Sequence, residues 1–185
     1  TGVYVGASWL DYEILRKDEG LDATRHFTIG NALYVVTARL SYFYGLKGPS
    51  LTVETGCSSG MVALHLASKA LENGEIDSAF VGGVNLILAP FLSVGLTRFG
   101  RLSPNGRCSA FYDHADGFVR GEGVVALYIK TLDPAHADGH RIHAIIAGTA
   151  VNNDGGGDPL VFPSATGQEN LLSIFNGQVD FNLDK

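Results

Sequence analysis

Apolar residues along the chain fall into short β-branched runs and helical repeats that alternate in sequence. Residues 1–7 form a run typical of a strand, and residues 78–88 form a longer one typical of a strand buried on both faces. Between them, apolar side chains three to four positions apart predict a helix over residues 31–44. The same patterns predict further helices over 11–16, 58–73, 166–175 and within 90–101, and further strands over 51–54, 124–129 and 142–147.

The order of three neighbouring elements indicates the fold class. A strand over residues 51–54, a helix over 58–73 and a strand over 78–88 have the spacing of a βαβ unit, which implies parallel strands in a layered α/β protein. On this helix, His65 and Ser68 are expected to lie on a polar face. Polar connections are expected at residues 21–28, 133–140 and 152–159, and Ser8 is the expected N-cap of the helix over 11–16.

The turn between the strand over residues 51–54 and the next helix carries a cysteine, Cys57, directly after Gly56. The first backbone N–H groups of a helix lack an intrahelical partner and form the positive end of its dipole, and both effects favour a thiolate over a thiol. Such a turn also lifts a nucleophile clear of the sheet, as the strand-to-helix elbow of hydrolases does for serine. A buried cysteine that only packs is the alternative, and the context of Cys57 favours the reactive one.

Composition limits the class of protein further. Hydrophobic residues make up 45% of the 185 residues and charged residues 17%, which is typical of a globular domain, or part of one, with a substantial core. The net charge of −6, without a cluster of lysine and arginine, argues against a nucleic-acid surface. No run reaches the about 18 consecutive apolar residues of a membrane span, and no signal-peptide pattern opens the chain.

Two cysteines, Cys57 and Cys108, are too few and too far apart for a disulfide framework or a zinc site. They favour a reducing compartment, and the cytoplasm is the predicted location. The sequence begins at Thr1 in a predicted strand and ends at Lys185 shortly after a predicted helix. We therefore expect residues 1–185 to be one partial domain of a longer polypeptide, truncated at both ends.

Several motifs occur in a fixed order along the chain. The block Gly48-Pro-Ser-Leu-Thr-Val-Glu-Thr-Gly-Cys57-Ser-Ser-Gly-Met-Val-Ala-Leu64 resembles the active-site signature of β-ketoacyl synthase (ketosynthase) domains. The resemblance is greatest to type I polyketide synthases and animal-type fatty acid synthases, and it extends over residues 1–175. Further motifs agree in order and spacing, namely Val81-Gly-Gly-Val84, Leu102-Ser-Pro-Asn-Gly-Arg-Cys-Ser-Ala-Phe111, Asp116-Gly-Phe-Val-Arg-Gly-Glu-Gly-Val124 and Gly148-Thr-Ala-Val-Asn-Asn-Asp-Gly155.

The resemblance implies a thiolase-like α/β fold with layers in the order α-β-α-β-α, of which this chain would form mainly the N-terminal half, and a homodimer. It also implies decarboxylative Claisen condensation in polyketide biosynthesis. Cys57 would accept an acyl group from the phosphopantetheine arm of an acyl carrier protein, and a malonyl-type extender would lose CO₂ and attack the thioester. The Cys57 N–H is the expected donor to the thioester oxyanion. This segment is expected to bind neither a cofactor nor a metal.

The sequence departs from the family pattern in two ways. Glu54-Thr-Gly56 precedes the cysteine where the family more often has Asp, Thr and Ala, and Gly60 stands where serine is common; neither change is expected to remove activity. The family's two catalytic histidines lie in later motifs that these residues do not include, so the chain alone is expected not to condense. His65 lies ~12 Å along a helix from Cys57 and ~80° around it, beyond hydrogen-bond reach. The other histidines, His26, His114, His136, His140 and His143, are expected in loops and polar connections.

Other residues of the motifs have structural explanations. Cys108 is expected to be structural, and Arg120 and Glu122 to pair with each other or to cap neighbouring backbone. The loop over residues 152–159 could line a substrate entrance. Core packing is expected, rather than an acyl tunnel, for Phe91, Phe99 and Phe162.

Three functions remain open from the sequence. The first is the ketosynthase of a polyketide synthase. The second is another thioester-condensing enzyme, such as a thiolase or a synthase of fatty acid biosynthesis, although Ser58-Ser59 and the motif over residues 117–123 disfavour a thiolase. The third is a non-condensing scaffold or carrier-protein docking domain, which the presence of Cys57 disfavours.

Overall fold

The β-branched runs of the sequence meet in a four-stranded sheet in a computed structural model that describes residues 1–20, 24–156 and 162–178. Its strands are β1 (Gly2–Ala7), β2 (Ser50–Val53), β3 (Ser78–Asn85) and β4 (Gly123–Lys130), in the order β2-β1-β3-β4. β1 pairs in parallel with β2 and β3, and β4 pairs antiparallel to β3. The predicted α/β class is confirmed, and β1 lies between the two strands of the predicted βαβ unit.

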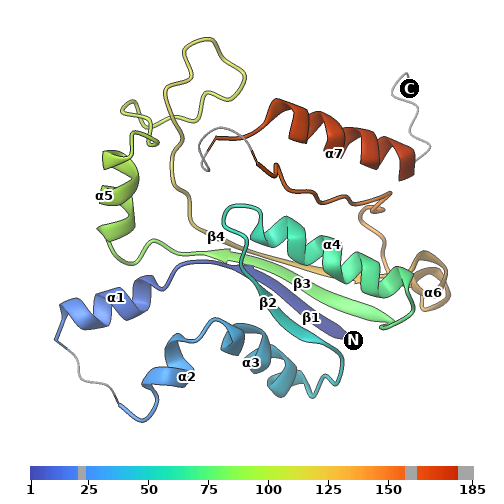
Figure 1. The fold of residues 1–185 in the computed structure, drawn as a ribbon. Coiled ribbons are helices and arrows are strands. Elements are labelled where there is room, and N and C mark those ends of the chain that lie inside the picture. Colours follow the sequence, from blue (N-terminus) through green and yellow to red (C-terminus); the bar gives the residue numbers. More distant parts are fainter. Residues whose placement is uncertain (21–23, 157–161, 179–185) are drawn as a thin grey trace.

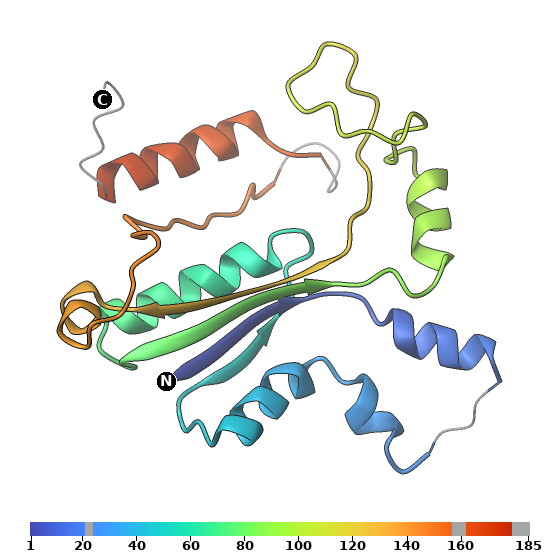
Figure 2. The same ribbon diagram turned by 180° about the vertical axis from the view of Figure 1, so that it is seen from behind.

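Helices cover both faces of this sheet (Figures 1 and 2). α4 (Ser59–Glu72) packs on one face against β1 and β3, whereas α3 (Tyr34–Tyr44) packs on the other against β2 and β1. On the side of α4, both views show the extended chain of residues 141–155, with α7 (Ala165–Gln178) beyond it. The remaining helices are α1 (Asp11–Asp18), α2 (Phe27–Asn31), α5 (Phe91–Arg98) and α6 (Leu132–Ala137).

The main core lies between α4 and the sheet. Ala63, Ala67 and Ala70 follow the helical repeat along one side of α4 and are buried. Because these side chains are small, the helix approaches Tyr4 of β1 and Val81 of β3 closely. By contrast, many apolar side chains of β4 are exposed, including Val124, Val125, Leu127 and Tyr128.

The closest approach of α4 to the sheet is made at Gly6, near the end of β1. A Cβ atom at Gly6 would overlap the backbone nitrogen of Gly60 and the carbonyl carbon of Ser59, both in the first turn of α4. A Cβ atom at Gly83 of β3 would in turn lie 3.9 Å from the Gly60 Cα. The first turn of the helix therefore rests on the backbone of β1, with glycine as the only residue that fits at position 6.

Some local predictions were wrong because short elements depend on backbone hydrogen bonds. Residues 142–147, predicted as a strand, form no ladder with any part of the chain that the structure describes, and a strand requires such a partner. The predicted loop at 21–28 ends in α2, with residues 21–23 outside the described chain, and the predicted connection at 133–140 contains α6. Proline is tolerated in the first turn of a helix, so Pro134 does not prevent α6.

Two serines also lie where the sequence did not predict them. Ser8 does not cap α1, which begins after Leu10; its hydroxyl instead lies near Ser59 of α4. Ser68 is buried rather than on a polar face of α4.

The strand predicted over residues 78–88 ends at Asn85. Beyond it, the Ile87 N–H donates to the Glu122 carboxylate and the Leu88 N–H donates to the Asp11 carboxylate, so neither N–H group pairs with a neighbouring strand.

The contact at Gly6 can be tested by adding one methyl group. We expect Gly6→Ala to lower the free energy of unfolding by about 1–3 kcal/mol, because the new Cβ forces α4 away from β1. Urea unfolding of a longer protein that includes these residues, followed by circular dichroism, measures this change.

The matched control is Gly95→Ala in the middle of α5, where a Cβ atom meets no other atom within 4 Å. Alanine favours a helix over glycine, so this variant should be more stable by about 0.5–1 kcal/mol. Equal stability of Gly6→Ala and the unchanged protein would contradict the close approach.

Candidate active site

Cys57 lies in the turn between β2 and α4, at the carboxyl end of a parallel strand, and it is exposed. Gly56 has a φ of +69°, in the left-handed region that glycine enters without strain. α4 begins two residues after Cys57, so the turn adjoins the unpaired N–H groups of its first turn. Gly56, which stands where the family more often has alanine, is thus compatible with this turn.

Serine hydroxyls hold this turn in place. Ser59 is buried, and its Oγ accepts a hydrogen bond from the Thr55 N–H at 2.9 Å and donates one to the Gly56 carbonyl at 2.6 Å. The Ser8 Oγ, just after β1, lies 3.2 Å from the Ser59 Oγ. Through Ser59 and Ser8 the turn is tied to α4 and to the end of β1. The exposed Ser58 hydroxyl makes a local bond instead, donating to the Thr55 carbonyl at 2.9 Å.

Cys57 borders a cavity of about 640 Å³. Its walls come from the ends of β1 and β3, the first turns of α4, α5, residues 118–121 and β4. The large apolar side chains of the wall are Trp9, Met61, Leu64, Leu92, Leu96, Phe118, Val125 and Leu127. A mainly apolar hollow of this size beside an exposed cysteine suits an apolar ligand chain.

The sequence did not identify these wall residues. Leu92 and Leu96 stand four positions apart on α5, so helical periodicity was the only signal that could have grouped them. Trp9 carries no such periodic signal. It lines the cavity, and its φ of +70° is uncommon for a residue other than glycine. The distant segments that form the cavity meet only through the fold.

Arg120 and Glu122 bind different partners rather than each other. The Glu122 carboxylate accepts a hydrogen bond from the Ile87 N–H at 2.6 Å. Of the two roles expected from the sequence, pairing with Arg120 or capping backbone, Glu122 therefore has the second. Arg120 lines the cavity and donates from Nη1 to the Ser93 hydroxyl on α5 at 2.7 Å. These bonds hold α5 and the chain before β4 around the cavity.

Cys108 lies in the chain between α5 and β4, and its Sγ accepts a hydrogen bond from the Val119 N–H at 3.1 Å. This contact agrees with the structural role predicted for Cys108. In the same segment, hydrogen bonds from Ser103 and then from Asn105, whose Nδ2 lies 2.6 Å from Asp116 Oδ2, hold the pKa of Asp116 below its ordinary value.

The histidines have contacts away from Cys57. The His65 Nδ1 on α4 lies 2.8 Å from the Thr149 hydroxyl, so this ring joins α4 to the extended chain above it. His114 contacts the Tyr112 ring, and His140 contacts the Tyr128 ring. Among the described residues, no histidine is hydrogen-bonded to Cys57.

The prediction that Phe91, Phe99 and Phe162 lie in the core was wrong. Their exposed fractions are 71%, 54% and 57%, and none is among the described residues that line the Cys57 cavity. The Arg101 guanidinium lies 4.9 Å from the centre of each of the Phe99 and Phe162 rings. Stacking on a cation lets these two rings remain at the surface, and it joins the chain after α5 to the chain before α7.

The motif at residues 152–154 caps a helix. Asn152 donates from Nδ2 to the Gly167 carbonyl at 2.7 Å, and Asp154 accepts a hydrogen bond from the Ser164 N–H at 3.0 Å. Ser164 in turn accepts from the Gly167 N–H at 3.0 Å, as an N-cap serine does. These polar side chains therefore fix the start of α7, and residues 157–159 of the predicted loop lie outside the described chain.

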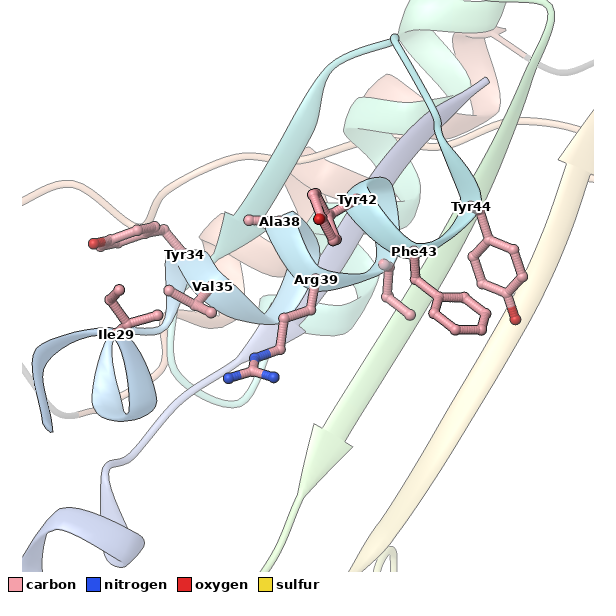
Figure 3. Close-up of a pocket in the computed structure, with 9 residues that line it drawn as sticks. Ile29, Tyr34, Val35, Ala38, Arg39, Tyr42, Phe43 and Tyr44 are labelled. Atoms are coloured by element: carbon pink, nitrogen blue, oxygen red, sulfur yellow. The ribbon is translucent and has the colours of Figure 1, made fainter. Parts of the chain in front are cut away.

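A second cavity of about 730 Å³ lies along α3, on the opposite face of the sheet from α4 (Figure 3). Tyr34, Tyr42, Phe43 and Tyr44 project around it, and Arg39 is the charged side chain of its wall. Its wall offers neither a nucleophile nor an acid–base pair, so we place the candidate active site at Cys57.

The residues that the structure describes contain no group of three or more histidine, cysteine, aspartate or glutamate side chains that could hold a metal ion. Within the same residues, no helix has the length and apolar character needed to cross a membrane.

Fold and site together define a class of protein: a layered α/β protein that presents a cysteine at a strand-to-helix turn beside an apolar cavity. Residues 1–135 match the family described as β-ketoacyl synthase, N-terminal domain, and the chain belongs to this family. The family resemblance that the sequence motifs indicated is thus confirmed.

Relatives and solved structures agree with this assignment. The chain is 41% identical over 175 residues to a phenolphthiocerol/phthiocerol polyketide synthase of Mycobacterium tuberculosis and 46% identical over 173 residues to polyketide synthase GfsA of Streptomyces halstedii. These matches cover 94% and 93% of this chain but only 8% and 2% of the two relatives.

Among solved structures, the ketosynthase from module 6 of the bacillaene synthase of Bacillus subtilis 168 superposes with a TM-score of 0.87 and 40% identity. This match covers 97% of this chain and 30% of that one. The chain therefore has the thiolase-like ketosynthase fold and forms mainly its N-terminal half.

Proposed function

We propose that Cys57 is the acyl-accepting nucleophile of a β-ketoacyl synthase that acts in polyketide biosynthesis. The observation that carries this proposal is the place of Cys57, at the strand-to-helix turn and beside the apolar cavity of about 640 Å³. A thiol there is next to the N-terminal end of α4, and the mainly apolar wall of the cavity suits an acyl chain.

In the first step, the Cys57 thiolate attacks the carbonyl carbon of an acyl thioester on the phosphopantetheine arm of a carrier protein. The tetrahedral intermediate collapses with cleavage of the original C–S bond, so the phosphopantetheine thiolate leaves and the acyl group stays on Cys57. The Cys57 N–H is the donor available in the turn to the oxyanion of this intermediate. One difficult condensation is thereby divided into two easier transfers.

In the second step, a malonyl-type extender on a carrier protein loses its carboxylate as CO₂, and the electron pair of the broken C–C bond forms an enolate. The enolate carbon attacks the Cys57 thioester, and the C–S bond breaks to return the Cys57 thiolate. The family resemblance places the histidines that assist this step in motifs that the 185 residues do not contain. We therefore assign acyl loading, and not condensation, to these residues alone.

The partners follow from the same chemistry. An acyl carrier protein brings both substrates, and this segment itself binds no cofactor in the proposal. Both cysteines are free, which supports a reducing compartment such as the cytoplasm.

The alternatives are less well supported. The relatives with 41% and 46% identity are polyketide synthases, which favours polyketide over fatty acid biosynthesis. A scaffold domain has no need of a cysteine held at the turn by buried serine, nor of a cavity beside it.

We further propose that the domain is a homodimer. β2 and β4 stand at the two edges of the sheet, and an edge strand offers unpaired backbone groups to a second copy. Sedimentation equilibrium of a complete ketosynthase domain that includes these residues should give twice the monomer mass. A monomer mass at all concentrations would contradict the proposal.

Acyl loading gives the direct test of the proposed nucleophile. A complete ketosynthase domain that includes these residues, incubated with the octanoyl thioester of N-acetylcysteamine, should gain one octanoyl group on Cys57. Cys57→Ala should not gain it, because the acceptor sulfur is missing. Intact-mass measurement and peptide mapping identify the acylated residue.

Cys108→Ala is the matched control, because it removes the other exposed thiol. This variant should load at the unchanged rate. Loading on Cys108 in place of Cys57 would overturn the assignment of the nucleophile. A dimeric domain that cannot be loaded at all would favour the scaffold alternative.

The cavity wall should set the length of acyl chain that loads. Leu96→Trp fills part of the cavity, so we expect the rate of octanoyl loading relative to acetyl loading to fall about 10-fold, the cost of leaving one or two methylenes outside the cavity. Val94→Trp adds the same bulk to α5 at an exposed position outside the wall. Loss of octanoyl selectivity in both variants, or in neither, would show that the chain binds elsewhere.

A further inference from the structure

The carbonyl of Gly56 accepts hydrogen bonds from Ser59, and the hydroxyl of Ser8 lies at the outer limit of hydrogen-bond distance. The Ser59 hydroxyl donates to it at 2.6 Å, the Ser59 N–H at 3.1 Å and the Ser8 hydroxyl at 3.5 Å. Ser59 is 5% exposed, so its hydroxyl is committed to bonds within the protein, the second of which is accepted from the Thr55 N–H. The orientation of the Gly56 carbonyl is therefore fixed from the side of α4 and β1.

Fixing this carbonyl also fixes the N–H of Cys57. Both groups belong to one planar peptide unit, in which the C=O and the N–H of a trans peptide point in opposite directions. Because the Gly56 carbonyl points toward Ser59, the Cys57 N–H points away from it. Gly56 itself, at a φ of +69°, has no side chain to restrict rotation of this unit, so the restriction must come from its hydrogen bonds.

We propose that Ser59 is a positioning residue, which aims the Cys57 N–H at the oxyanion of the thioester intermediate through its bond to the Gly56 carbonyl. This inference rests on the proposed function of Cys57. Ser59 itself contacts no substrate. Its hydroxyl sets the direction of a donor, and a donor stabilises an oxyanion only if it is aimed before the reaction.

Ser8 contributes to the same restraint from β1. Its hydroxyl contacts both Ser59 and the Gly56 carbonyl, and its residue lines the cavity beside Cys57. The exposed Ser58 hydroxyl, by contrast, donates to the carbonyl of Thr55 and makes no bond to the Gly56 carbonyl. The two adjacent serines of α4 and its cap thus offer a matched pair of variants.

The experiment compares two reactions of the same sulfur in a complete ketosynthase domain that includes these residues. Acylation by octanoyl N-acetylcysteamine passes through an oxyanion, whereas alkylation by iodoacetamide displaces iodide and forms none. We expect Ser59→Ala to slow acylation of Cys57 about 10- to 100-fold, because one oxyanion donor is misaligned, and to leave the alkylation rate unchanged. Ser58→Ala should change neither rate, and Ser59→Thr, which keeps the hydroxyl, should restore most of the acylation.

Acylation of Ser59→Ala at the unchanged rate would overturn the inference, as would an equal loss in acylation and alkylation, since that pattern reflects a disordered turn. If Ser59→Ala does not fold, Ser8→Ala decides: its acylation should fall about 2- to 10-fold with alkylation unchanged, as expected for one lost hydrogen bond, and an unchanged acylation rate would overturn the inference. If the unchanged domain is alkylated but never acylated at Cys57, the proposed function itself fails.

Discussion

The contact between the first turn of α4 and the backbone of β1 determines where everything else in the site can lie. At Gly6 the two backbones meet without an intervening side chain. This contact sets the height of the α4 N-terminus above the sheet, and with it the position of Cys57 relative to the ends of β1 and β3. The cavity wall includes the same two strand ends, so one packing contact places both Cys57 and the cavity.

α4 connects the layers of the fold. Its alanine side packs on the sheet, whereas His65 on another side bonds to Thr149 of the extended chain. The polar side chains of that chain then fix the start of α7 through Asp154 and Ser164. A sequence of contacts thus extends from the sheet through the helix that follows Cys57 to the outer helix, which explains why residues far from the cavity still belong to the family motifs.

The strands and long helices could be predicted because their periodic apolar pattern matches the burial they undergo. The place of Cys57 could be predicted because a glycine-flanked cysteine between a strand and a helix is a local pattern. The cavity wall could not, since Trp9, Leu96 and Leu127 come from separate elements that only the fold brings together. Residues 142–147 have a suitable β-branched composition, but a strand exists only where a neighbour shares its backbone hydrogen bonds, and no described residue does so. The role of Ser59 was hidden because it depends on hydrogen bonds in three dimensions.

The exposed apolar side chains of β4 have a practical consequence for handling the protein. Val124 and Val125 are 71% and 61% exposed on opposite faces of the edge strand β4, and Tyr42 and Phe43 are exposed apolar side chains on α3. Soluble monomers rarely carry apolar patches of this kind, and open strand edges beside them favour aggregation. Recombinant production of these residues by themselves should therefore yield inclusion bodies, and a solubility tag or a longer gene segment is the appropriate starting point for biochemistry.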